Sequence, residues 1–272
     1  MLVRYPTFDL STWSPQWGHN PEAVVIVNAG GIIPAAIERF LIRVMRQAKK
    51  LLDPVTDAEL IADIEIFNKQ EGQHLKLHAE YLLWLRDNGY PRILEFEAAF
   101  EAELQQFLAS KPLDWNLAYS EGFESTGCAM AEAWINGAIA ELCGDHGSAP
   151  MRLWMWHLAE EFEHRSVVHR VLEQLYGLER AFELRKAGAE FNRPHSRGHA
   201  LAAGAYMHEV NRAGMTAGEV AVSVEREQAA WEGMAIAYGD TLNWVFQPGY
   251  DPAAVPAPRD YEAVLSMYAP AS

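Results

Sequence analysis

The chain has 272 residues, half of them hydrophobic, so it is long enough to bury a substantial core. Its 37 acidic residues outnumber its 22 basic residues and give a formal charge of −15, which argues against an extended nucleic-acid surface because phosphate binding relies on Lys and Arg. The two cysteines, Cys128 and Cys143, are too few for a disulfide framework or a thiolate metal site, and we expect both to be small buried thiols.

The longest uncharged stretch covers residues 23–37. It is too short to cross a hydrocarbon layer of about 30 Å, and it is broken by Asn28, two glycines and Pro34. The first twenty residues lack the basic and apolar segments of a secretory signal. We therefore expect a cytoplasmic protein that does not insert into membranes.

Apolar residues recur at helical spacing almost throughout, and few segments have the alternation of a strand. Proline and glycine mark the expected ends of the helices, and Gly214 could interrupt the last one. We expect residues 247–258, rich in Pro and Ala, to be an ordered coil lying on the body. The predicted helices, in chain order, are 21–52, 57–88, 93–108, 115–143, 149–176, 179–193 and 201–245.

No linker or shift of composition divides the chain. We predict a single all-α domain over residues 1–272, folded as a ferritin-like four-helix bundle with additional C-terminal helices. The helical core would span residues 21–176. The C-terminal helices and the tail would span residues 177–272.

Two Glu-x-x-His pairs stand out on the predicted helices. Glu71 and His74 lie on the second long helix, and Glu161 and His164 lie on the fifth. Residues three apart share one face of a helix, so the Glu and His of a pair can reach one metal together. Either pair alone is weak evidence, because a helical chain this rich in Glu should contain about one such pair by chance.

The placement of the pairs makes the prediction stronger. On the long helix before each pair stands a Glu among apolar residues, Glu38 before the first pair and Glu121 before the second. The chain thus repeats a helix with Glu followed by a helix with Glu-x-x-His, which is the ligand plan of ferritin-like dimetal carboxylate bundles. Four carboxylates would offset two divalent cations. The alternative is that the glutamates are solvated surface charges and the histidines are core residues.

Two further histidines share the faces of these pairs. His157 lies four residues before Glu161, and we predict it to be an additional ligand, with an orienting role as the alternative. His78 follows His74 by four residues, and we expect it to orient a ligand rather than to bind metal.

Nearby glutamates leave one alternative open. Glu124 lies one turn after Glu121 and could be the ligand in its place. Glu160 and Glu163 lie on other faces of their helix, and we expect them to pair with Arg165 or Arg152. The predicted metal ligands are Glu38, Glu71, His74, Glu121, His157, Glu161 and His164, with His78 and Glu124 as candidates for supporting roles.

We expect two metal ions at this site. Histidine and carboxylate ligands suit iron, which we favour, and also manganese or zinc.

At these residues the sequence resembles the family described as predicted metal-dependent hydrolases, which are ferritin-like helical proteins. The resemblance covers about residues 32–176, and it departs from the family where Glu121-Gly122-Phe123-Glu124 stands in place of Glu-His-Phe-Thr and where Arg170 replaces an aspartate. The resembling stretches are Glu38-Arg39-Phe40, Asp53-Pro54, Phe67-Asn68-Lys69-Gln70-Glu71-Gly72-Gln73-His74 with His78, and Trp156-His157-Leu158-Ala159-Glu160-Glu161-Phe162-Glu163-His164.

The triplet His157, Glu161 and His164 is also similar to the ligand helix of di-iron aryl-amine N-oxygenases, where an extra histidine joins the usual set. This second resemblance concerns one motif and the plan of the site. It implies oxygen chemistry at an iron pair rather than hydrolysis.

We therefore predict a non-heme di-iron oxygenase or oxidase that activates O₂ at the Glu/His dimetal site to oxidise a small organic substrate, using an electron donor. The alternative is a dimetal-dependent hydrolase that uses a metal-bridging hydroxide. A second alternative is ferritin-like iron storage or peroxide scavenging, which needs neither the extra histidine nor the C-terminal extension. A homodimer is compatible with the sequence.

Overall fold

The computed structural model describes residues 1–268, and helices joined by short turns make up most of this part of the chain. No strand occurs in residues 1–268, so the all-α prediction is confirmed. In chain order the elements are α1 (Pro21–Gly30), α2 (Ile32–Lys49), α3 (Ala58–Asp87), α4 (Ile93–Ser110), α5 (Leu113–Ile135), α6 (Ala138–Cys143), α7 (Ala149–His164), α8 (Val167–Tyr176), α9 (Leu178–Arg212), α10 (Ala217–Tyr238), the 3-10 helices η1 (Thr241–Phe246) and η2 (Pro252–Ala254), and α11 (Tyr261–Ser266).

Side-chain caps start three of the α-helices, α1, α7 and α10. The side chain of Asn20 accepts a hydrogen bond from the Ala23 amide and starts α1, with Pro21 in the first turn. The Ser148 hydroxyl accepts from the Met151 amide at 3.1 Å and starts α7. These caps satisfy backbone N–H groups that a helix leaves unpaired at its N-terminus, and the cap at Ser148 fixes where α7, which carries Glu161 and His164, begins.

Three predicted helices are interrupted in the structure. The predicted helix 21–52 divides into α1 and α2 at Gly31. The predicted helix 115–143 divides into α5 and α6 at Gly137, whose φ of 89° favours glycine. The predicted helix 149–176 divides into α7 and α8 at Arg165 and Ser166.

The predicted break after residue 193 is wrong, because α9 continues through Pro194 to Arg212. Proline costs a helix one backbone hydrogen bond, but α9 packs against α5, α1 and α4 along its length, and this packing overrides the local preference. The next helix starts only at Ala217, after Gly214 with φ of 85°.

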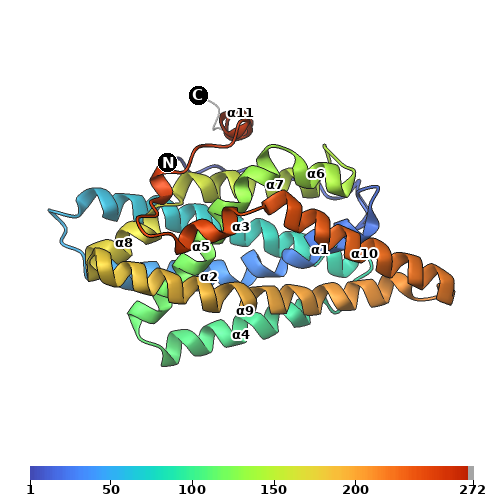
Figure 1. Cartoon of the computed structure of the whole chain (residues 1–272), viewed down its shortest axis with the longest axis horizontal. Coiled ribbons are helices and arrows are strands. Elements are labelled where there is room, and N and C mark those ends of the chain that lie inside the picture. The colour runs from blue at the N-terminus through green and yellow to red at the C-terminus, as the bar shows by residue number, and fades with distance from the viewer. Residues whose placement is uncertain (269–272) are drawn as a thin grey trace.

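Four long segments form the bundle that holds the site. Helix α2 packs on α3 and α5, α5 packs on α7, and α3 packs on α7 and α8. Helix α9 runs along most of the long axis of the molecule, with α4 beside it (Figure 1). Helix α10 covers α1 and α6, and α11 lies on α7.

Helices α5 and α9 approach closely through glycines. A Cβ on Gly188 would overlap the Ala118 carbonyl, and a Cβ on Gly122 would lie 2.5 Å from the Gly188 carbonyl oxygen. Only residues without a side chain permit this distance between the two backbones. The contact holds the C-terminal half of the chain against the ligand-bearing α5.

The tail, residues 247–258, lies on the body, as the sequence predicted, although it includes one short 3-10 helix, η2. The buried Arg185 guanidinium donates to the carbonyl oxygens of Val245 at 2.9 Å, Gln247 at 3.3 Å and Tyr250 at 3.4 Å. One buried cation thus fixes two points of the tail and one just before it. Both cysteines are buried and free, as expected.

Within residues 1–268, the stretch Pro21–Lys49 is the one helical segment long and apolar enough to cross a membrane by length and composition. Of its most apolar window, 72% is buried inside the protein. Core helices of folded proteins have the same property, so this stretch is weak evidence for a membrane span.

Candidate metal centre

Six of the predicted ligands converge inside the bundle, and each is at most 2% exposed. They come from α2, α3 and α7. Their ligand atoms form two groups, within each of which the atoms lie within 4.8 Å of one another. The first group is Glu38, His74, His157 and Glu161, and the second is Glu71, Glu161 and His164. Glu161 belongs to both groups, so metal ions held by the two groups would share one carboxylate.

Glu161 lies at the centre of this arrangement. Its Oε1 atom is 3.5 Å from His74 Nδ1, 3.1 Å from His157 Nε2 and 3.6 Å from His164 Nε2. Helix α5 leaves room for the carboxylate because a Cβ on Gly127 would lie 2.5 Å from Glu161 Oε2. The close approach of α5 therefore depends on glycine at this position.

On α5 the structure places Glu124, and not Glu121, beside the ligand cluster. Glu124 Oε2 is 3.4 Å from His164 Nε2. Glu121 Oε1 instead accepts a hydrogen bond from His169 Nδ1 at 3.2 Å. The predicted position of Glu121 is thus corrected in favour of the alternative, one helical turn further along, while metal binding by either residue stays a prediction.

Hydrogen bonds outside the cluster orient two of the histidines. His74 Nε2 donates to Glu160 Oε2 at 3.1 Å, and Arg4 Nη1 donates to Glu160 Oε1 at 3.0 Å. His164 Nδ1 donates to Gln70 Oε1 at 3.1 Å. These bonds leave His74 Nδ1 and His164 Nε2 facing the carboxylates without a hydrogen-bond partner. Metal-binding histidines commonly have such an outer partner, because it fixes the tautomer and the ring orientation.

The predicted partners of Glu160 and Glu163 were wrong. Both carboxylates pair with Arg4, whose Nη1 is 3.0 Å from Glu160 Oε1 and 2.9 Å from Glu163 Oε2. Arg165 instead donates to the Pro252 carbonyl at 2.7 Å. Arg4 precedes the first helix and carries no recognisable motif, so the sequence offered no signal for this contact.

His78 contacts the outer nitrogen of His157, with 2.7 Å between Nε2 of His78 and Nδ1 of His157. His157 Nε2 then faces inward, 3.1 Å from Glu161 and 3.5 Å from Glu38. This placement fits the orienting role predicted for His78.

The buried carboxylates lack the partners that such groups normally have. Both oxygens of Glu38, Glu71 and Glu124 have no hydrogen-bond partner in the described structure. In residues 1–268 their ion pairs, and those of Glu161, are with histidines alone. A buried ionised group costs several kcal/mol unless it is paired or binds a metal. The oxygen and nitrogen donors, with no thiolate among them, fit divalent iron, manganese or zinc.

The electrostatics of the cluster show the same need for positive charge. Burial, together with repulsion from Glu161, raises the pKa of Glu38 and Glu71 well above the usual range and raises that of Glu124 to about 7. Burial would also raise the pKa of Glu161, but the neighbouring His164 holds it well below the usual range. Without metal, Glu161 is therefore the carboxylate that the histidines keep ionised, while Glu38, Glu71 and Glu124 favour their protonated forms.

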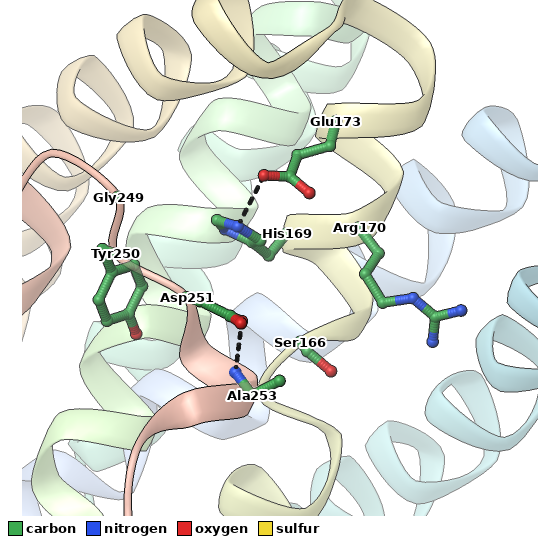
Figure 2. A pocket seen from close by; sticks show the side chains of 8 residues that line it. All are labelled: Ser166, His169, Arg170, Glu173, Gly249, Tyr250, Asp251 and Ala253. Atoms are coloured by element: carbon green, nitrogen blue, oxygen red, sulfur yellow. Dashed lines mark hydrogen bonds and ion pairs between the residues drawn. The ribbon is translucent and has the colours of Figure 1, made fainter.

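A hollow of about 400 Å³ lies at the α8 side of the site (Figure 2). His169 forms part of its wall, and this ring links the hollow to α5 by donating to Glu121. The tail forms the opposite wall. The lining residues are Ser166, His169, Arg170, Glu173, Gly249, Tyr250, Asp251 and Ala253. Sequence reasoning missed His169, whose only signal was its position five residues after His164.

We predict that Glu124→Gln lowers the number of bound metal ions per chain, whereas Glu121→Gln retains it. The two substitutions are chemically identical, but only Glu124 approaches the ligand His164. Metal content measured by mass spectrometry after purification checks this. Equal metal loss in both variants would contradict the placement of the two glutamates.

We also predict that metal stabilises the protein more at pH 8 than at pH 6. The raised pKa values of Glu38, Glu71 and Glu124 mean that the metal-free native state holds extra protons, and their stabilising effect is lost as the pH rises through these values. Metal must displace such protons. For each proton displaced, the free energy of metal binding becomes about 1.4 kcal/mol more favourable with each unit that the pH rises. The melting temperatures of metal-loaded and chelator-treated protein are compared at each pH, so that unfolded-state contributions cancel. The same difference at both pH values would contradict the prediction.

The comparisons with known proteins agree with this geometry. A family model described as predicted metal-dependent hydrolase matches residues 2–255. Comparison with curated proteins and with solved structures gives no match, and the likeness to di-iron N-oxygenases is not confirmed. The family match includes Arg4, every candidate ligand and the tail as far as Val255. Because it extends over nearly the whole chain, the chain belongs to the family of predicted metal-dependent hydrolases.

Proposed function

We propose that this protein is a hydrolase that works with two metal ions, in the bundle interior. The observation that supports it best is the convergence of buried ligand atoms on Glu161 without enough hydrogen-bond partners. The family description favours hydrolysis over the oxygenase that the sequence analysis put first. The proposed ligands are Glu38, Glu71, His74, Glu124, His157, Glu161 and His164.

The protein's contribution is charge, position and exclusion of water. Two divalent cations, when bound, would lower the pKa of a coordinated water and polarise the bond under attack. Four carboxylates offset their charge, and Glu161, common to both groups, fixes one position relative to the other. The outer bonds from Glu160 and Gln70 hold His74 and His164 in place, so no reorganisation is needed when metal binds.

We assign the hollow beside His169 as the substrate entrance. His169 Nδ1 donates to Glu121, and Nε2 lies 3.2 Å from Glu173, so the ring lies between two carboxylates at the wall of the hollow. Burial would lower the pKa of His169, but the bond to Glu121 raises it on balance. His169 is thus a titratable group in the wall of the hollow, and we propose that it contacts the substrate as it enters.

A second candidate, an iron-dependent oxygenase, is favoured by one observation. His157 Nε2 faces Glu38 and Glu161, which adds a third histidine to four carboxylates. Hydrolysis does not require this extra ligand, whereas the set is similar to that of di-iron N-oxygenases.

The test is turnover of ester, amide and phosphate-ester substrates by protein reconstituted with zinc, manganese or iron in the absence of O₂. We expect the rate of hydrolysis to fall at least about 100-fold in Glu161→Gln, because this substitution removes the shared ligand. Glu225→Gln, an exposed position on α10, is the matched control and should retain activity.

Two results would contradict the proposal that this centre catalyses hydrolysis. One is O₂ consumption by the reduced iron form together with no hydrolysis by any metal form, which would favour the oxygenase. The other is identical hydrolysis by wild type and Glu161→Gln, which would place the reaction away from this centre.

A further inference from the structure

A second group of metal-ligating side chains lies apart from the buried centre. Glu103 comes from α4, and His195 and His199 come from α9. Glu103 Oε2 is 2.8 Å from His195 Nε2, and Glu103 Oε1 is 3.4 Å from His199 Nε2. One ligand atom from each residue lies within 4.8 Å of the others. One small cation could therefore contact all three side chains.

The local geometry aims the imidazole nitrogens at the carboxylate. His195 and His199 are four residues apart on one helix and so share a face. His195 Nε2 donates to Glu103 Oε2 at 2.8 Å, and a bound cation would take the place of that proton. Tyr119 Oη lies 2.8 Å from His195 Nδ1, where it would then accept the Nδ1 proton and hold the ring in place. In residues 1–268 the ion pairs of Glu103 are with these two histidines alone. A divalent cation bound among these three side chains would place a permanent positive charge beside the Glu103 carboxylate.

The surroundings are those of a partly open site. The side chains of His195 and His199 are 16% and 17% exposed, and that of Glu103 is 48% exposed, so solvent reaches the cluster. On the inner side the Phe100 ring lies 4.6 Å from the His199 ring and 5.5 Å from the His195 ring. The Phe100 ring excludes water on the inner side, which reduces the screening of charge there by solvent. The open side leaves room for a water ligand.

We propose that Glu103, His195 and His199 bind one zinc ion, with water as the fourth ligand. Two imidazoles and one carboxylate are a recurrent zinc ligand set, and three protein ligands leave one tetrahedral position open. The ion joins α4 to α9 and, through Tyr119, contacts α5, the helix that carries Glu124.

The test is zinc binding to the full chain, measured by competition with a chromophoric zinc chelator. Wild type should bind one more zinc ion per chain than His199→Ala and Glu103→Gln, or bind that ion at least about tenfold more tightly. His146→Ala removes an exposed histidine outside the cluster and should match wild type. Circular dichroism verifies that each variant is folded, which Glu103→Gln should be because its side chain is half exposed.

A second measurement separates this site from the buried centre. Zinc added to protein whose buried centre is already loaded should raise the melting temperature of wild type and of His146→Ala, but not that of Glu103→Gln. The same zinc stoichiometry, affinity and thermal shift in all four proteins would overturn the proposal and identify the cluster as an ordinary ion pair. The buried ligands are unchanged in every variant, so this result does not depend on the proposed hydrolase.

Discussion

Four carboxylates share the interior of one helical bundle, and in residues 1–268 no Lys or Arg side chain pairs with Glu38, Glu71, Glu124 or Glu161. Such a cluster is unstable in a low-dielectric interior unless protons or cations neutralise it. The rest of the site follows from this constraint. Histidines are interleaved with the carboxylates, Gly127 leaves space for the central one, and every ligand comes from a helix anchored by packing. Metal ions would supply the charge that the chain itself does not provide.

The supports of the centre extend well beyond its ligands. Arg4 near the start of the chain holds Glu160, which in turn holds His74, so the N-terminal segment is connected to the cluster by two hydrogen bonds. At the other end, Arg185 fixes the tail that forms one wall of the hollow beside His169. These contacts connect segments near both ends of the family match, residues 2–255, to the candidate metal centre.

Much of the site could be predicted from the sequence, because residues three or four apart on a helix point to the same side of it. The pairs Glu71 with His74 and Glu161 with His164 had to share a face, and the preceding helices had to carry the remaining carboxylates. The choice between Glu121 and Glu124 could not be made, since the two differ by one turn and only the axial position of α5 separates them. That position depends on long-range packing, which local patterns do not encode. The same packing carries α9 through Pro194 against its local preference.

The most direct test of the dimetal centre is anomalous X-ray diffraction from crystals of the full chain loaded with manganese. Metals sharing a carboxylate in such sites lie about 3.5 to 4 Å apart. The account predicts two anomalous peaks at that separation on either side of Glu161, one beside Glu38, His74 and His157 and the other beside Glu71, Glu124 and His164. A single peak, or peaks remote from Glu161, would contradict it.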